Sequence, residues 1–410
     1  MKSFFSFLIF ALFSSAGLAS PLALTSFREV LEKVGNESPK LHARQFEALS
    51  SKSFALSKYL TWSPTVVGTA SQGIKEWGLD SGETAALQAK LNLFRFGGDL
   101  SALKESSRTR EQADLNFKLA PITLEAEAAT LIFQWLEVQK RLESQRSLNE
   151  RKRELSRVAQ NRYKMGQLPA QEVEKVRLDF TNSEIQIRQA QVQLLDLRSQ
   201  LDGVLPGLTM VRDWPWEKVD LKTKRNEKNL RDRMVFKVRD LEVQIRDSKS
   251  YQAGTDWAPR LDLTSSWVSN QISPLESGDW TSQLVLTIPF WEQGNSIASR
   301  NYWSDLRRAA AADLKSFELS ETAKLQTLQE RRSELYQNAM LARESAERAR
   351  SLASESIRRF QAGRATVNDL LLDQARVFES ESLAFTTMRD YHLVLLETCL
   401  AAEERASRCY

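Results

Sequence analysis

RYKMG at residues 162–166 returns later in the chain as RFQAG at residues 359–363, and this repetition decides how the fold is read. A second pair of matching segments precedes the two motifs: LNLFRFG ends at Gly97, and IPFWEQG ends at Gly294. The interval from this glycine to the following motif is the same in both places. Matching segments at equal spacing indicate that the chain contains two copies of one structural unit.

Each copy contains two segments in which apolar and polar residues alternate, as they do in β-strands. The expected strands cover about residues 65–75 and 84–94 in the first copy, and about 260–271 and 279–291 in the second. Strands of this length with one apolar and one polar face are typical of water-filled membrane barrels. The alternative is a soluble hairpin packed on a core, but four strands in 410 residues would have no obvious partner sheet.

Long helices follow the strands in both copies. Between residues 98 and 163, and again between 295 and 360, the only proline is Pro121. Each stretch would form a helix about 100 Å long. Apolar and small residues recur at heptad spacing, which predicts an antiparallel coiled-coil hairpin. The seams consist of Leu115, Leu119, Ile122, Ala126, Ala129, Phe133 and Leu136, and of Val176, Phe180, Ser183, Ile187, Ala190, Leu194, Leu197 and Leu201.

The tips of the two helical hairpins are marked by Gly166 and Gly363, which we expect in the left-handed conformation that ends a helix. Helix-starting signals follow in both copies. Pro169 suits the first turn of a helix, and Thr366 has capping-box spacing to Asp369. The sequence therefore predicts a sharp reversal of the chain at both glycines.

These signals give the expected organisation of the chain. The N-terminus has a positive charge at Lys2, an apolar run at residues 4–13 and small residues before Ser20, as a signal peptide does. An uncleaved membrane anchor is the alternative, but so short a run is half of what a bilayer needs. The predicted parts are a signal peptide (1–19), repeat 1 (20–203), an equatorial linker (204–223) and repeat 2 (224–410), with helices at 26–59, 224–252 and from 366 to about 406.

The charged residues, 57 basic and 53 acidic, are interleaved along the helical stretches, which indicates solvated helix surfaces and no nucleic-acid partner. The sequence contains no phosphate-binding glycine loop, serine elbow or His/Cys cluster, so we expect no enzyme, cofactor or metal site. His42 and His392 stand alone, and we expect both at a surface or interface. Cys399 and Cys409 could pair only if the chain turns back after about Ala401, so their pairing stays open.

The signal peptide, the two strand pairs, the two long helical hairpins and the R-[YF]-x-x-G motif of each repeat together resemble the TolC family of outer-membrane efflux proteins. The resemblance covers nearly the whole chain after residue 19. It implies a mainly α fold with a small β part: two-repeat coiled-coil hairpins, plus four strands per chain in a shared 12-stranded barrel of a homotrimer. If the strands span the membrane, oligomerisation is also expected on physical grounds, because four strands cannot close a barrel and an open sheet edge is unstable in lipid.

By the same resemblance, the chain would be a passive channel through the outer membrane and periplasm of a Gram-negative bacterium. It would serve a tripartite efflux or type I secretion system, with outer-membrane lipid, a periplasmic adaptor protein and an inner-membrane transporter as partners. The alternative function is a periplasmic adaptor or coiled-coil spacer, although an adaptor would carry one helical hairpin between β-rich domains. The exported substrate, whether drug, metal or protein, is left open.

The resemblance also implies site residues. The adaptor-facing hairpin tips would comprise Arg162, Tyr163, Gly166, Arg359, Phe360 and Gly363. The alternative is that these residues only shape the turns. A pore gate of carboxylates would include Asp369, whereas the second family position holds Leu372, with Asp373 one residue late. Three like charges around a narrow axis would attract cations. Asp369 is also placed to satisfy the first turn of its helix, and the two roles are compatible.

Overall fold

The structure is a computed structural model. It describes residues 26–72, 83–95, 97–207, 229–255, 258–269, 278–289 and 294–410. The predicted signal peptide, most of the predicted linker, residues 224–228 and the last residues of three predicted strands lie outside the described residues.

The chain divides into two compact units, each assembled from separate segments. The hairpin unit comprises Met1–His42, Ala120–Lys228 and Ala323–Tyr410, and the sheet unit comprises Ala43–Leu119 and Asn229–Thr322. Two of the boundaries fall within the long helices α3 (Gly98–Lys164) and α6 (Asn295–Gln361). Both helices match the predicted long stretches closely. None of the described helices combines the length and the apolar character that a membrane span needs.

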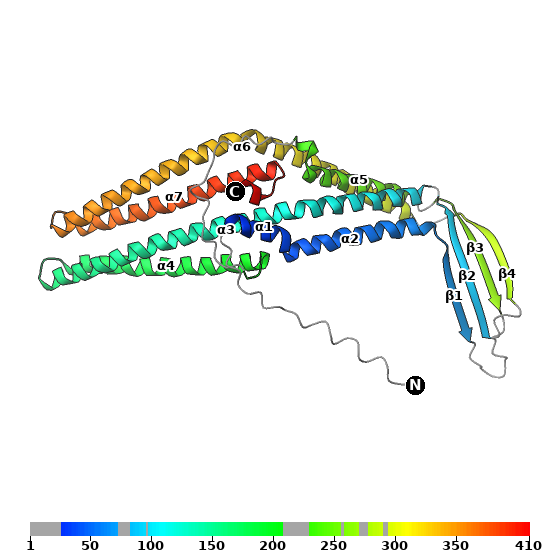
Figure 1. Cartoon of the computed structure of the whole chain (residues 1–410), viewed down its shortest axis with the longest axis horizontal. Coiled ribbons are helices and arrows are strands. Elements are labelled where there is room, and N and C mark those ends of the chain that lie inside the picture. The colour runs from blue at the N-terminus through cyan, green and yellow to red at the C-terminus, as the bar shows by residue number, and fades with distance from the viewer. Residues whose placement is uncertain are drawn as a thin grey trace. The chain divides into compact units, whose positions relative to one another are not determined.

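The sheet unit contains one antiparallel sheet with the strand order β1-β2-β3-β4 (Figure 1). Its strands are β1 (Thr65–Gln72), β2 (Glu83–Phe94), β3 (Arg260–Ser269) and β4 (Gly278–Thr287). All four lie at the predicted places, but β4 stops at Thr287, before the predicted end. The reason is Pro289, which lacks the N–H that a strand interior needs. The two repeats meet where β2 pairs with β3.

The strand register gives the sheet one largely polar and one largely apolar face, because directly paired residues project to the same side. The polar face carries Thr65, Gln88, Lys90, Asn92, Asp262, Thr264, Ser266, Thr281 and Gln283. The opposite face carries Val66, Leu87, Leu91, Leu261, Leu263, Trp267, Trp280, Leu284 and Leu286. On the polar face, Lys90 Nζ lies 3.0 Å from the Asp262 carboxylate. The alternation predicted from sequence therefore becomes a two-faced sheet.

Polar contacts join several helices of the sheet unit. The unit contains most of α2 (Pro39–Tyr59), the single turns η1 (Leu60–Trp62) and η3 (Leu230–Asp232), and α5 (Met234–Gly254). Ser101 of α3 donates to the carbonyl of Ser248 on α5 at 2.7 Å. α5 also contacts α6 through Asp247, which accepts a 2.9 Å hydrogen bond from Arg307. Thus α5 is hydrogen-bonded to both long helices, α3 and α6.

The hairpin unit contains two helical hairpins, one of α3 and α4 (Ala170–Val204) and one of α6 and α7 (Val367–Ala401), as Figure 1 shows. It also holds α1 (Phe27–Glu37) and the short α8 (Ala406–Cys409). The helix predicted over 26–59 is broken at Ser38, because the following Pro39 disfavours helical geometry there. Ser38 instead donates its hydroxyl to the carbonyl of Val204 at 3.0 Å.

The core of the hairpin unit lies where α1, α3, α4, α7 and α8 meet. Its fully buried side chains include Val30, Leu31, Ala129, Ile132 and Phe133. The predicted heptad seams account for much of this packing, since most seam residues from Leu119 to Leu201 are buried or half-buried. Further along the first hairpin, Val138 and Leu142 pack against Ala190 and its neighbours. The predicted coiled-coil pairing of α3 with α4 therefore matches the structure.

The two histidines differ from each other. His42 is exposed, as expected. The prediction is wrong for His392, which is completely buried in the chain's own core. Its ring stacks on Phe133 with 5.0 Å between the ring centroids. Burial lowers the pKa of His392 to about 4, so the ring is neutral at physiological pH.

The two cysteines form a disulfide between α7 and α8. The helix predicted to continue to about residue 406 ends at Ala401, and the chain then turns back. The Cα atoms of Cys399 and Cys409 consequently lie 6.4 Å apart. The condition stated for pairing is therefore met.

Candidate functional site

The candidate site is the pair of hairpin tips in the hairpin unit. At the first tip, α3 ends at Lys164 and Gly166 has a φ of 70°. The Gly166 N–H donates to the carbonyl of Tyr163 at 2.9 Å, and the Gln167 N–H donates to the carbonyl of Arg162 at 2.8 Å. These two bonds satisfy carbonyls that have no partner within the helix.

The second tip repeats this backbone pattern. Gly363 has a φ of 72°, its N–H donates to the carbonyl of Phe360 at 2.9 Å, and the Arg364 N–H donates to the carbonyl of Arg359 at 2.8 Å. A Cβ atom at Gly166 or Gly363 would meet nothing within 4 Å. The backbone conformation, and not lack of space, therefore requires glycine. The predicted left-handed glycines are confirmed at both tips.

Arg162 of the first tip reaches the second tip. Its guanidinium donates to the carbonyl of Phe360 at 3.1 Å and to that of Gln361 at 3.4 Å. The guanidinium carbon also lies 4.5 Å from the centroid of the Phe360 ring. A cation at the C-terminus of α6 complements the negative end of the helix dipole. Arg162 thus caps the C-terminus of α6, which belongs to the other repeat.

Phe360 is the apolar anchor of the two tips and is only 3% exposed. It belongs to a cluster drawn from α3, α4, α6 and α7. The buried members are Leu155, Ala159, Val176, Phe360, Val367 and Leu370. Both hairpins therefore share one core near their tips.

Tyr163 and Arg359 occupy the matching repeat positions but have different surroundings. Tyr163 is 50% exposed, whereas its repeat counterpart Phe360 is buried. Arg359 donates to Glu355 of its own helix at 3.1 Å and does not cross to the first tip in the way that Arg162 crosses to the second. Of the six predicted tip residues, Arg162, Phe360 and the glycines shape the tips, and Tyr163 and Arg359 face outward.

Asp369 forms the predicted capping box at the start of α7. Its Oδ2 accepts hydrogen bonds from the Thr366 hydroxyl at 2.6 Å and from the Thr366 N–H at 3.1 Å. The Asp369 N–H donates in return to the Thr366 hydroxyl at 3.2 Å. The hydrogen bonds from the Thr366 side chain, and then its backbone, lower the pKa of Asp369. The exposed carboxylate is therefore negatively charged at neutral pH.

Asp373 has a different environment from Asp369. It is half-buried, and it accepts hydrogen bonds from Ser356 of α6 and, at 3.2 Å, from Arg376. Leu372, which occupies the second family position, is exposed. The structure therefore does not bring the two predicted gate carboxylates into one environment: Asp369 is at the surface, and Asp373 joins α6 to α7.

Sequence reasoning missed a set of buried charges that join the helices. Glu137 of α3 accepts a 2.6 Å hydrogen bond from Arg389 of α7. Glu381 of α7 accepts from Ser144 and Arg350, and Lys152 of α3 lies 2.9 Å from Asp179 of α4. Charges among apolar seam positions were the only local signal for these contacts. Within the described part of the chain, no group of three or more His, Cys, Asp or Glu side chains could hold a metal ion.

Paired helical hairpins with matched glycine tips, on a chain that also carries a two-faced sheet of four strands, define a class of proteins with long helical hairpins and one small antiparallel sheet. Residues 31–206 match the family model described as outer membrane efflux protein. This match, over less than half of the chain, supports the predicted resemblance to the TolC family. The match agrees with the predicted outer-membrane location and with the predicted role in efflux.

Solved outer-membrane proteins share the fold. The CmeC outer membrane channel of Campylobacter jejuni is 12% identical with a TM-score of 0.76, covering 92% of this chain and 85% of that one. The outer membrane protein VceC of Vibrio cholerae is 12% identical with a TM-score of 0.72, covering 92% and 96%. The open state of the MtrE outer membrane channel of Neisseria gonorrhoeae is 14% identical with a TM-score of 0.72, covering 92% and 89%. No curated protein matches the sequence.

Proposed function

We propose that the chain forms, as a homotrimer, the passive channel of a tripartite efflux or type I secretion system. Its strands line the passage through the outer membrane, and its helical hairpins extend that passage into the periplasm. A periplasmic adaptor and an inner-membrane transporter, which supplies the energy, are its partners. The two-faced sheet with open edges is the observation that carries this proposal.

The sheet supports a shared barrel for two reasons. First, its apolar face leaves large side chains exposed in the single chain: Leu284 is 62% exposed and Trp280 is 63% exposed. Lipid would cover this face, and water would fill the space over the polar face. Second, within the described sheet β1 and β4 each have one hydrogen-bonded neighbour. An edge of unpaired backbone groups is unstable in lipid. Three copies, joined β4 to β1, would close 12 strands.

The hairpin unit supports association of copies as well. Four large apolar side chains on α4 are exposed in the single chain: Leu178, Ile185, Val192 and Leu195. Their spacing is that of a heptad stripe, which is typical of a helix face that packs against another helix. A contiguous apolar stripe on a soluble surface is unfavourable unless it is covered. A neighbouring copy in the trimer would cover it.

Docking of the adaptor would use the outward side chains at the hairpin tips. Tyr163 and Arg359 are exposed, as is Met165 next to Gly166. Aromatic, arginine and methionine side chains are enriched in protein interfaces. Arg162 and Phe360 would act indirectly, by holding the tips in shape. Replacing Tyr163 and Arg359 by alanine should weaken adaptor binding and leave the trimer intact, whereas an unchanged affinity would remove the tips from the interface.

Asp369 is the better of the two candidates for a pore gate. Both bonds from Thr366 use Oδ2, so Oδ1 is available to a cation while the capping box is intact. Replacing Asp369 by asparagine removes the charge and keeps an acceptor for Thr366. If Asp369 lines the closed end, this variant should change conductance or cation block in planar bilayers, and Asp373→Asn should change them less. Unchanged single-channel currents in the Asp369 variant would rule out its gate role.

The decisive test of the channel is the state of the protein in its membrane. Protein extracted from outer membranes in mild detergent should run as a heat-modifiable trimer, slightly lighter than three times the 46.8 kDa mass of the full chain because the signal peptide has been removed. Chemical cross-linking should stop at trimers. A soluble periplasmic monomer or dimer would contradict the channel and support the alternative of a coiled-coil spacer.

A further inference from the structure

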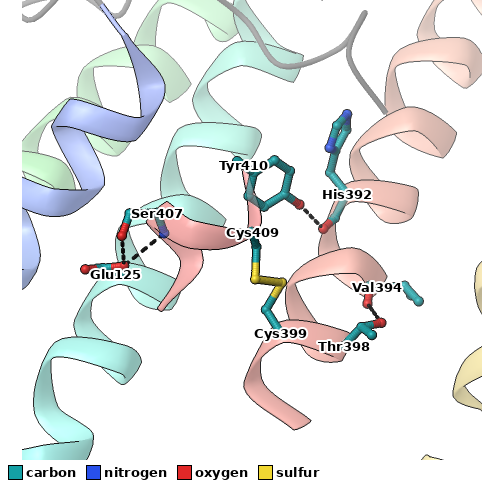
Figure 2. Close-up of a disulfide and its surroundings, with 8 residues drawn as sticks. All are labelled: Glu125, His392, Val394, Thr398, Cys399, Ser407, Cys409 and Tyr410. Carbon is teal, nitrogen blue, oxygen red and sulfur yellow. Dashed lines mark hydrogen bonds between the residues drawn. A yellow bond between two sulfur atoms is a disulfide. The ribbon is translucent and has the colours of Figure 1, made fainter. Parts of the chain in front are cut away.

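The last nine residues of the chain fold back onto the hairpin unit. After Ala401 the Glu403 backbone takes a φ of 52°, and the Glu404 N–H donates to the carbonyl of Cys399 at 3.0 Å. The short α8 then runs from Ala406 to Cys409. Figure 2 shows the disulfide that joins this segment to α7. We call residues 402–410 the clasp.

The clasp completes the apolar core. The ring of Tyr410 lies 5.4 Å from that of Phe27 in α1 and 5.6 Å from that of Phe133 in α3, between ring centroids. Its hydroxyl donates to the carbonyl of His392 in α7 at 2.9 Å (Figure 2). Ala406 is buried in the same cluster. The clasp thus contacts helices from the beginning, the middle and the end of the chain.

The clasp also supplies hydrogen bonds to a buried carboxyl group. Glu125 of α3 has no exposed surface, and its Oε2 accepts from the N–H and hydroxyl of Ser407 at 2.9 and 2.8 Å (Figure 2). Arg405 lies 3.6 Å from Oε1 and donates to Asn36 of α1 at 3.1 Å. The carboxyl is packed so tightly that a Cβ on Gly35 would lie 2.4 Å from Oε1. Losing the clasp would leave this buried acid without these partners.

Noncovalent forces alone hold such a segment poorly. A helix of one turn is not stable by itself, because nucleation is unfavourable. Chain termini fray unless something fastens them. The disulfide attaches the clasp, because it joins Cys399 in the last turn of α7 to Cys409 near the end of the clasp. The clasp is therefore held by a covalent bond that persists in an oxidising compartment.

We propose that the Cys399–Cys409 pair is an oxidation site, and that a thiol–disulfide exchange protein closes the clasp as the last covalent step of folding. Cys399 is buried in α7, whereas Cys409 lies half-buried next to the chain end. In the reduced chain, the Cys409 thiolate attacks the disulfide of the oxidant, forms a mixed disulfide and releases one oxidant thiol. Cys399 then attacks the Cys409 sulfur and releases the second thiol. Two electrons and two protons pass to the oxidant, which is reduced from a disulfide to a dithiol.

The first test measures whether the disulfide holds the clasp. Full-length protein from outer membranes, alkylated without reduction, should carry no label on either cysteine, and carboxypeptidase should release its last residues slowly. Reduced and alkylated wild type, and the variant C399S/C409S, should lose residues 402–410 at least tenfold faster. Ser407→Ala, with the disulfide intact, should resist digestion much better than C399S/C409S. Labelled cysteines in the native protein, or equal digestion rates for the oxidised and reduced wild type, would overturn the proposal.

The second test identifies the partner by its chemistry. The single variant Cys399→Ser, expressed with its signal peptide and quenched by acid alkylation, should accumulate a mixed disulfide through Cys409 that reductant removes. Cys409→Ser should accumulate at least several-fold less, because its remaining thiol lies in α7. An equal yield from the two variants would overturn the assigned order of attack, and no mixed disulfide from either would overturn the exchange protein as the oxidant.

Discussion

The two hairpin tips have the same backbone and different side-chain contacts. Both reverse through a left-handed glycine with the same pair of backbone hydrogen bonds. Phe360 is buried where Tyr163 is exposed, and Arg162 crosses to the second tip where Arg359 stays on its own helix. The second tip also has a capping box, whereas α4 starts after Pro169 without a side-chain cap.

The difference between the tips shows that the glycine of the repeated motif and its arginine and aromatic residue serve different purposes. Glycine is required by the turn itself, and so it occurs in both copies. The arginine and the aromatic residue depend on what surrounds each copy. At the first tip the side chain of Tyr163 is half exposed. At the second tip the ring of Phe360 is part of the core that the two hairpins share. Repeat symmetry therefore holds for the backbone and is broken by tertiary contacts.

The largest asymmetry should appear on truncation of the two aromatic residues. Phe360→Ala should destabilise the tips by about 3–5 kcal/mol, because it leaves a cavity in a packed core. Tyr163→Ala should change local stability by no more than about 0.5 kcal/mol, because half of the side chain is exposed. Hydrogen exchange of the amides around Gly166 and Gly363 measures both effects. Similar losses in the two variants would show that the tips are equivalent in energy as well as in backbone.

Alanine at the two glycines should give a symmetric result. Gly166→Ala and Gly363→Ala should each cost about 1–2 kcal/mol, since an L-residue is strained in the left-handed region. No neighbouring atom would add a steric penalty at either position. Asparagine, which tolerates this conformation better, serves as the matched control and should cost less than alanine at both tips. If only one of the two variants lost stability in the same exchange experiment, the shared turn geometry would not determine the cost of replacing the glycine.

Replacement of the two arginines should restore the asymmetry on a smaller scale. Arg162→Gln should cost about 1 kcal/mol, because two hydrogen bonds to carbonyls at the end of α6 are lost or weakened. Arg359→Gln should cost less than about 0.5 kcal/mol, as expected for an exposed pair within one helix. The double variant Arg162→Gln/Phe360→Ala should lose less than the sum of the two single losses, because the side chains are in contact. Additive losses would exclude that coupling.

The predictable parts of this protein are those with a local signal. Strand alternation, the heptads, the tip glycines and the capping box of Thr366 and Asp369 each depend on residues a few positions apart. The contacts of Arg162 with the second tip and of Glu125 with Ser407 join distant segments, and no spacing in the sequence announces them. His392 was predicted at a surface or interface for the same reason: the ring of Tyr410 in the clasp lies 5.8 Å from its ring, between ring centroids, and the clasp turns at Glu403 without a glycine or proline to signal it.

The smallest effect should be a pH response that only the second tip shows. The hydrogen bonds from Thr366 lower the pKa of Asp369 in the folded chain, so the carboxylate stabilises the start of α7 at any pH above its ordinary pKa of about 4. That contribution is lost as the pH falls through the lowered folded value. Between pH 5 and pH 2, amide exchange at the first turn of α7, corrected for its intrinsic pH dependence, should therefore accelerate in the wild type. Thr366→Ala should weaken this acid response, because it removes the hydroxyl that lowers the pKa. The first turn of α4, which lacks a side-chain cap, is the internal control, and an equal acid response there would show that general acid loosening, and not the Asp369 cap, controls the second tip.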